Sequence, residues 1–350
     1  MMNKRKIVIL LLMVIVTRGT YAQIDLGTFL EGGVEDANKL LENYFEPVFI
    51  GVGTGLAGSW YNTGKPHKLL GFDITVNANF AYVPTADQTF TFNNSDYENI
   101  KLSDGVSEEL PTFAGSNLPA ENLPRLQFYD GPWDDAGSTE QLEVSALTGL
   151  GLEETSYPFV KSGAIPTAMV QLGIGLMKGT ELKFRFFPER SFGDSSEEIT
   201  AKLFGFGIMH DFKQWIPGLK KLPFDLSIFY GWSNLKTSMN INQDNNSNSD
   251  QQAVFNVKGS TFQIIASKKI SLLTVYTGLG FISSSTGFQM LGEYETETGT
   301  FNDPIDFEYN IGGAKLNFGA RMKLLIFTIH AEYAFQKYNT FNLGFGLSIR

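Results

Sequence analysis

The chain of 350 residues contains no cysteine and only three histidines. Without cysteine, disulfides cannot staple the fold and paired-cysteine metal sites are excluded. The histidines, His67, His210 and His330, are far apart and no HExxH motif occurs, so the sequence predicts no metal site and no cofactor. After the first 22 residues, no run approaches the ~18 apolar residues that a membrane-spanning helix needs. If the chain enters a membrane, it must do so as a closed β-barrel.

The first residues follow the plan of a secretory signal peptide. A basic start, Lys4 to Lys6, precedes an apolar run at 7–16 and a small residue, Ala22, before Gln23. We therefore expect a signal peptide over 1–22 that is cleaved near Ala22–Gln23. Its removal takes away four cations, which leaves 23 cations against 37 acids, or a net charge of −14. This negative charge argues against nucleic acid as a partner.

The C-terminal third alternates with a period of two residues. Phe327, Ile329, Ala331, Tyr333 and Phe335 fall on one face of a strand, while the residues between them are mostly polar. The stretches 314–324 and 341–349 repeat this pattern. Such alternation is typical of strands with lipid outside and water inside. A soluble antiparallel sheet produces the same pattern. The lengths of the connections must therefore distinguish a transmembrane barrel from a soluble sheet.

The connections alternate between long and short. Long connections lie at 84–166, 188–198, 237–251 and 284–311, and short ones at 177–180, 211–222, 267–271 and 324–326. Outer-membrane barrels have this order, with long extracellular loops and short periplasmic turns. The predicted fold is all-β, an antiparallel transmembrane barrel of about 10–14 strands in the cell outer membrane, with the lipid bilayer as a partner. The mean hydropathy of −0.07 is compatible, because a barrel hides its apolar residues at every second position.

The N-terminal region, 23–68, is expected to precede a barrel at 69–350. A short apolar stripe predicts a helix over 34–45 that Pro47 ends. The glycine-rich stretch 48–61 is either a first strand or a plug inside the lumen. Ten strands follow from Leu70, and because single-chain barrels have even strand numbers, either 48–61 is a plug or a partner strand hides in the 84–166 loop, with 140–147 as the candidate. Residues 23–68 are expected to begin on the periplasmic side.

Charged residues of both signs are predicted to point into the lumen. Mixed signs favour pairs that brace the wall over a selective ring of one charge. His330 is expected to be a lumenal partner of Glu332 and not a catalytic base, and no catalytic residue is predicted. Lys258 is a further lumenal candidate, and a slip of phase near Gly259 predicts a β-bulge. The predicted lumenal set is Asp73, Glu181, Lys183, Arg185, Asp225, Lys315, Arg321, Lys323, His330 and Glu332, and Trp215 and Trp232 are expected at the two membrane interfaces.

The N-terminal helix, the run GVGTGLAGSWYNTGKPHKLLGFDIT and the C-terminal strand FNLGFGLSIR resemble an uncharacterised family of Gram-negative outer-membrane β-barrel proteins. The resemblance covers most of the mature chain. In architecture, the chain is also remotely similar to the long-chain fatty-acid transporter family, whose barrels carry an N-terminal plug and take up hydrophobic molecules. These resemblances imply a fold, and no binding motif carries residue roles over.

Two functions remain open from the sequence. The first is a non-enzymatic, plugged channel or transporter for a small solute, with a hydrophobic molecule as one candidate. The second is a structural or secretion-associated barrel that binds protein partners through the loops at 84–166 and 284–311. The latter loop is acidic but lacks the DxDxDG spacing of a calcium loop. A lipid-hydrolysing enzyme is a third and weaker hypothesis, because His330 shares its face with residues placed in the lumen.

Overall fold

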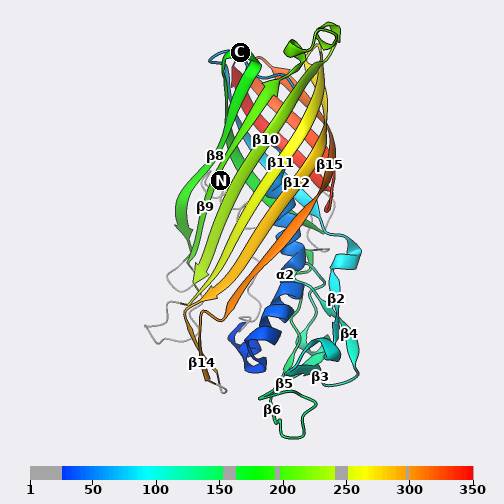
Figure 1. Cartoon of the computed structure of the whole chain (residues 1–350), viewed down its shortest axis with the longest axis vertical. Helices are drawn as coiled ribbons and strands as arrows, with labels where there is room; N and C mark the ends of the chain where they lie inside the picture. The colour runs from blue at the N-terminus through cyan, green and yellow to red at the C-terminus, as the bar shows by residue number, and fades with distance from the viewer. Residues whose placement is uncertain (1–25, 153–162, 194–197, 241–250, 297–298, 350) are drawn as a thin grey trace, which may run out of the picture.

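The structure is a computed structural model that describes residues 26–152, 163–193, 198–240, 251–296 and 299–349, so the expected signal peptide lies outside the described residues. Ten antiparallel strands form a closed barrel around one long helix, α2 (Val34–Ala57), which confirms the predicted fold class (Figure 1). The barrel closes where β1 pairs with β17, with Phe72 opposite Ile349. The barrel strands are β1 (Phe72–Tyr82), β7 (Ala164–Gly175), β8 (Thr180–Phe192), β9 (Ile199–Asp211), β10 (Asp225–Asn240), β11 (Gln252–Ile270), β12 (Leu273–Leu291), β15 (Ile305–Leu324), β16 (Phe327–Phe335) and β17 (Thr340–Ile349).

The two ends of the barrel differ. The connections β7–β8, β9–β10, β11–β12 and β15–β16 all lie at one end, which we call the short-turn end and which is at the top of Figure 1. The connections β1–β7, β8–β9, β10–β11 and β12–β15 lie at the opposite, long-loop end. The short-turn end carries the 3-10 turns η6 (Met177–Gly179), η7 (Lys213–Trp215) and η8 (Leu219–Lys221).

A small folded unit covers the long-loop end. We call it the loop domain, and it consists of η1 (Leu26–Gly32), the N-terminal half of α2 and residues 83–152. Ring contacts join its parts, with Phe29 and Phe128 centred 6.0 Å apart and Tyr44 and Phe113 5.8 Å apart. Its further elements are β2 (Thr89–Asn93), β3 (Ile100–Leu102), β4 (Ser107–Pro111), β5 (Arg125–Tyr129), β6 (Glu140–Ser145), η2 (Thr85–Asp87), η3 (Asn94–Asp96) and η4 (Ala120–Asn122). The candidate barrel strand at 140–147 is therefore β6, which pairs with β5 outside the barrel.

The helix α2 is twice as long as expected. It does not end at Pro47 but continues through the glycine-rich stretch to Ala57, so the strand alternative for 48–61 is wrong. A proline inside a helix removes one hydrogen bond, which is a local loss that the surrounding contacts offset. Twenty-four residues span about 36 Å, enough to run from the loop domain deep into the lumen. The first described element, η1 (Leu26–Gly32), and the start of α2 thus lie at the long-loop end, whereas residues 23–68 were expected to begin at the other end (Figure 1). No helix among the described residues has the length and apolar character required to cross a membrane.

The alternation of the strands continues along their whole length, but its sense inverts halfway. On β12, the outward residues Leu279 and Phe281 are exposed near the short-turn end, whereas the inward residues Phe288 and Met290 are buried near the long-loop end. The outward positions there are polar or glycine, apart from Leu291 at the end of the strand. Strands β10, β11 and β15 change at the same level. The short-turn half is therefore apolar outside, and the long-loop half is apolar inside, where it packs against α2.

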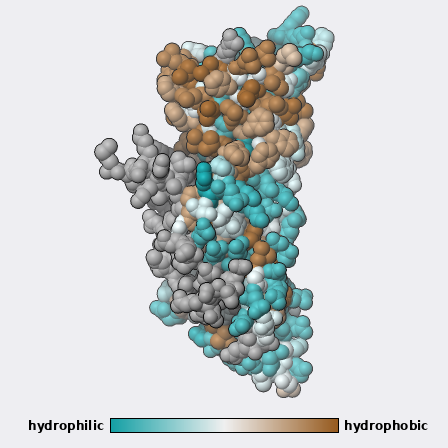
Figure 2. Space-filling model, turned by 90° about the vertical axis from the view of Figure 1, so that its left-hand side faces the viewer, coloured by the Kyte–Doolittle hydropathy of each residue, from teal (hydrophilic) through white to brown (hydrophobic). Residues whose placement is uncertain are grey.

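An apolar belt consequently surrounds the short-turn half. On the face shown in Figure 2, the described surface of the other half is mostly hydrophilic. An exposed apolar surface that closes around a barrel is the surface that faces lipid in a bilayer-spanning barrel. The belt includes Ile74, Val76, Val170, Phe184, Phe186, Phe204, Phe206, Ile208, Tyr230, Phe262, Ile264, Leu279, Phe281, Phe318, Met322, Ile329, Phe345 and Leu347.

The inversion corrects three expectations. Gly259 pairs with Ser233 and Ser284 in continuous register, so the slip of phase near it is the inversion and not a bulge. Lys258 points outward and is exposed, because it lies in the half whose outer face is polar. The loop expected at 284–311 shrinks to 292–304, since β12 and β15 extend beyond the belt, and it contains a hairpin of β13 (Glu293–Thr296) and β14 (Gly299–Asn302).

Candidate functional site in the barrel lumen

The C-terminal half of α2 and residues 58–71, together called the plug, occupy the lumen. The helix passes very close to the wall on two opposite sides, at β12 and at β7. A methyl group at Gly53 would lie 2.3 Å from Ser284 Oγ, and one at Gly55 would lie 2.3 Å from Thr167 Oγ1. Real side chains do not approach so closely, so only glycine fits at these positions. The glycine-rich run is therefore a packing device that lets a helix fill a narrow barrel.

Arg185 of β8 holds the end of the helix. Its Nη1 donates to the carbonyl oxygen of Leu56 over 2.7 Å, and its Nη2 donates to that of Gly58 over 2.6 Å. The guanidinium carbon also lies 3.6 Å from the centre of the Trp60 ring. The last carbonyls of a helix lack partners within the helix and carry partial negative charge. A fully buried cation at this point satisfies them and latches the plug to the wall.

Other polar side chains of the wall bind the backbone of the plug. Asn79 Nδ2 donates to the Gly55 carbonyl over 2.8 Å, Gln171 Nε2 donates to the Trp60 carbonyl over 2.8 Å, and Ser227 Oγ donates to the Gly64 carbonyl over 2.7 Å. Irregular backbone at membrane depth requires such partners, because water is excluded there. These wall groups are therefore engaged with the protein's own chain.

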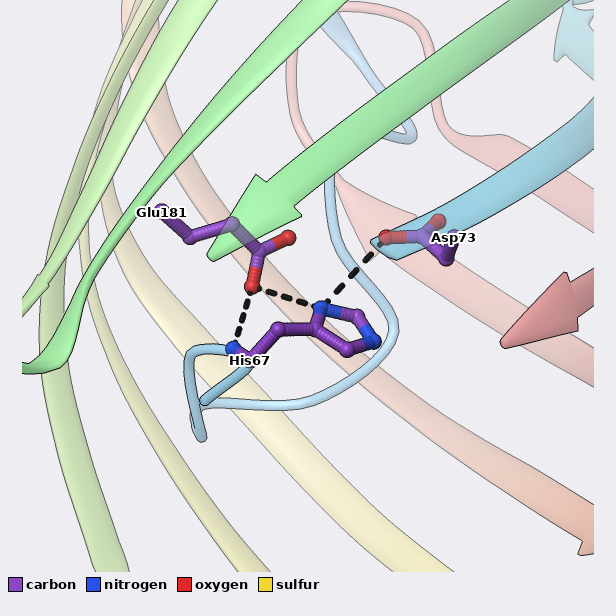
Figure 3. Close-up of side chains that lie close together, drawn as sticks. All are labelled: His67, Asp73 and Glu181. Carbon is purple, nitrogen blue, oxygen red and sulfur yellow. Dashed lines mark hydrogen bonds and ion pairs between the residues drawn. The ribbon is translucent and has the colours of Figure 1, made fainter. Parts of the chain in front are cut away.

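His67, near the end of the plug, lies inside a buried cluster of charges (Figure 3). Its backbone N–H donates to Glu181 Oε2 over 2.8 Å, and its Nδ1 lies 2.9 Å from the same oxygen and 3.6 Å from Asp73 Oδ1. Its Nε2 lies 3.0 Å from Ser348 Oγ. One imidazole thus joins the plug to three strands, β8, β1 and β17.

The donor set of this cluster could suit a metal ion, since ligand atoms of His67, Asp73 and Glu181 lie within 4.8 Å of one another. However, Lys183 Nζ is 2.5 Å from Glu181 Oε1 and 3.6 Å from Asp73 Oδ1. Arg321 is a further electrostatic partner of both carboxylates. Two cations already balance two anions, so a divalent ion would add uncompensated charge to a buried site. The arrangement fits a brace for the wall and plug better than a metal centre.

A second network ties the plug to β15 and β16. Tyr61 OH donates to Asn317 Oδ1 over 2.9 Å, and Asn317 Nδ2 donates to Glu332 Oε2 over 2.9 Å. Lys315 Nζ lies 3.9 Å from Glu332 Oε1. Glu332 thus has partners other than the expected His330, which is buried next to β17.

The structure brings most of the predicted lumenal residues together. Asp225 and Lys323 lie at the short-turn mouth, where Lys65 is 3.9 Å from Asp225 and Lys323 donates to Ser348 Oγ over 3.0 Å. The others are buried in the lumen: Asp73, Glu181, Lys183, Arg185, Lys315, Arg321, His330 and Glu332.

The two predicted interface tryptophans lie at opposite edges of the belt. Trp215 is exposed in the β9–β10 turn, where its indole N–H donates to His210 Nε2 over 2.8 Å. Trp232 points outward on β10, at the level where the alternation inverts.

The sequence did not predict the roles of Trp60, Tyr61 and His67, because no periodic pattern marks residues of an irregular segment. The glycine run beside them was the one available signal.

The fold and its surface define a bilayer-spanning antiparallel β-barrel with a helix sealed into its lumen. The chain belongs to a family described as "Family of unknown function (DUF6588)", whose model matches residues 2–349. No curated protein sequence matches the chain.

The chain is also similar, at low TM-scores, to several solved barrel structures. Ail, the attachment invasion locus protein of Yersinia pestis, is 13% identical with a TM-score of 0.27, and the match covers 49% of this chain and 96% of that one. The translocator domain of the autotransporter NalP from Neisseria meningitidis is 10% identical with a TM-score of 0.30, over 93% and 99% of the two chains. The Ralstonia pickettii toluene transporter TbuX is 8% identical with a TM-score of 0.17, over 86% and 97%. Likenesses this distant carry no conclusion about this chain, and the resemblance to the long-chain fatty-acid transporter family stays an expectation.

Proposed function

We propose that this protein is an outer-membrane anchor that holds a folded loop domain at the cell surface, where that domain docks a protein partner. The observation that carries the proposal is that α2 belongs to both parts of the molecule. Its C-terminal half is latched in the lumen by Arg185, and its N-terminal half supplies the buried residues Leu40, Leu41, Tyr44 and Phe45 to the core shared with the loop domain. One rigid element thus fixes the loop domain to the barrel.

The proposed location rests on the apolar belt and on the expected signal peptide. Closed barrels with short turns at one end and long loops at the other are typical of outer membranes, with the long loops outside the cell. The loop domain then faces the exterior. Residues 83–152 contain 12 acidic and two basic residues, which favours a partner with a basic contact surface.

Transport of a small solute is the second candidate. It is favoured by residues 58–71, which contain no helix or strand and which wall side chains hold by individual hydrogen bonds, so this segment could rearrange without unfolding the barrel. It is opposed by the packing of α2, because withdrawing the helix would expose the core of the loop domain. An apolar pocket beside Leu40 and Tyr44 has about 10 Å³ of free volume, room for one water molecule rather than for a hydrophobic solute.

Planar-bilayer recordings on the folded full-length protein distinguish the two candidates. A sealed anchor gives no steady conductance, whereas steady conductance from the wild-type protein would overturn the anchor proposal and favour the channel.

Photo-crosslinking in intact cells tests the docking role. A photoreactive residue replaces Glu109 or Asp134 in the loop domain, and the matched controls replace Lys202 or Lys236 on the outer wall of the long-loop half. The proposal expects a discrete protein adduct from the loop-domain positions alone. Adducts from neither set, or equally from both, would contradict it.

A further inference from the structure

The short-turn end exposes apolar side chains at the tips of its connections. Leu70 is 72% exposed, Met177 70%, Trp215 59%, Leu272 52% and Leu325 90%. Each comes from a different connection, so the feature belongs to the whole end and not to one loop. Turn tips that face water are ordinarily polar. This end of the barrel is therefore built for a less polar medium.

Two of these tips also have a strained backbone. Leu70 has φ of 61° and Leu325 has φ of 56°, in the left-handed region that favours glycine or asparagine. Leu325 is the first residue of a two-residue turn between Leu324 and Phe327. A leucine here gains nothing from packing within the protein, because it is almost fully exposed. Its side chain therefore suits an environment outside the protein.

Lysines surround the apolar tips. The partly exposed carboxylates at this end are Asp211 and Asp225, and Lys65 lies 3.9 Å from Asp225. No aspartate or glutamate among the described residues of this end is fully exposed. Lysine can lay its apolar stem along an acyl surface while its ammonium reaches a phosphate. The exposed lysines are Lys65, Lys68, Lys178, Lys220, Lys221, Lys268 and Lys269.

The apolar tips are continuous with the belt. Exposed apolar residues such as Leu176, Ile270, Leu273, Leu324 and Phe327 link the turns to the belt strands. The medium that covers the belt therefore extends over the turns, and an ammonium layer lies where a bilayer has its phosphates.

We propose that the short-turn end is immersed in the headgroup layer, where its lysines bind the phosphates of anionic glycerophospholipids and its apolar tips reach the acyl boundary. This inference is independent of the loop domain and of any docking partner. Continuity with the belt and the excess of lysine favour a lipid surface over a soluble protein as the occupant.

Lipid selection tests the charged part of the proposal. The full-length protein is placed in nanodiscs that contain phosphatidylcholine with a minor fraction of phosphatidylglycerol, and lipids that stay bound after gentle detergent release are identified by native mass spectrometry. The variant Lys220→Gln/Lys268→Gln/Lys269→Gln is compared with Lys202→Gln/Lys236→Gln/Lys258→Gln, three exposed lysines of the long-loop half. We expect the wild type and the control to retain phosphatidylglycerol preferentially, and the short-turn variant to retain it about fivefold more weakly per lysine removed. Equal retention by both variants would overturn the proposal.

Cysteine labelling tests the proposed position of the apolar tips. Because the chain has no native cysteine, only the introduced cysteine reacts. In nanodiscs, Leu325→Cys should react about tenfold more slowly with a water-soluble maleimide than Val106→Cys, which is 76% exposed in the loop domain. Both substitutions are at exposed positions, and unboiled gel mobility verifies folding. If the two cysteines react at the same rate, the tips lie in water and the proposal fails. Protection of Leu325→Cys that appears only when a periplasmic extract is added would assign the surface to a protein instead and would also overturn it.

Discussion

Arg185 Nη1 donates a hydrogen bond to the carbonyl oxygen of Leu56 over 2.7 Å, so a side chain of the barrel wall caps the last turn of a helix 129 residues away in sequence. The same guanidinium binds Gly58 and covers Trp60, so it holds the helix end, the turn that follows and the first aromatic residue of the irregular segment.

Replacing Arg185 with methionine should therefore destabilise the protein. Two buried carbonyls would lose their partners, which costs about 3 kcal/mol in the free energy of unfolding. Urea unfolding in lipid vesicles measures this loss. Arg190→Met on the same strand, where the side chain is exposed, is the matched control and should have little effect. Equal stability of the two variants would show that the latch is not a stabilising contact.

Gly53→Ala should destabilise the fold although alanine is the better helix former by about 1 kcal/mol. The new methyl group would lie 2.3 Å from Ser284 Oγ, so the helix or β12 must shift. Ser284→Gly should restore part of the loss in the double variant. The control is Gly218→Ala, since no atom lies within 4 Å of the added methyl group there. The thermal stability of the wild type, Gly53→Ala, the double variant and Gly218→Ala is measured as the temperature at which the band of folded protein disappears from an unboiled gel.

Lys183→Gln should create a metal site from the buried cluster. Without the ammonium, Asp73 and Glu181 keep one compensating cation, and His67 already lies 2.9 Å from Glu181 Oε2. We expect visible absorption from bound Co²⁺ in this variant and none in the wild type. The double variant Lys183→Gln/His67→Ala should lose the signal. Co²⁺ binding by the wild-type protein would contradict the charge-balance argument.

Acidification should stabilise the N-terminal half of α2 within the loop domain. Burial, with a smaller effect from Glu46, raises the pKa of Glu42 above its ordinary value of 4.5. The folded state therefore binds this proton more readily than the unfolded state, so the stabilisation is full below pH 4.5 and is lost as the pH rises through the folded-state pKa. Amide exchange over 36–46, corrected for intrinsic rates, should slow on acidification.

The charge of Glu42 accounts for this effect if Glu42→Gln flattens the pH response and protects the helix at neutral pH. Glu35→Gln, an exposed position on the same helix, should retain the wild-type response. If both variants behave alike, the pH dependence arises elsewhere.

The barrel strands were predictable because their alternation is set by lipid on one side and protein on the other. The strand ends were not, since beyond the belt the same strands turn their apolar side inward. This is why β12 extends to Leu291 and β15 starts at Ile305, both inside a stretch expected to be a loop. The change of sign at Gly259 was interpreted as a bulge for the same reason.

The helix and the lumenal cluster show the limit of local reasoning. Glycines 51, 53 and 55 have poor helix propensity, and the contacts that make them helical come from Ile165, Ser284 and Thr167, which are distant in sequence. The alternation identified the charged residues that face inward, such as Lys183 and Glu332. It did not identify the plug residues that join these networks, because Tyr61 and His67 belong to a segment without a repeat.

The tight fit at Gly53 also constrains how the molecule is built. A barrel too narrow for one methyl group at this level cannot let Phe49 pass toward the short-turn end or Trp60 pass toward the long-loop end. The helix therefore cannot be threaded into a finished cylinder. The pairing of β1 with β17, which closes the barrel, must therefore form around a helix that is already in place. The helix then acts as a template for the assembly of the ten strands.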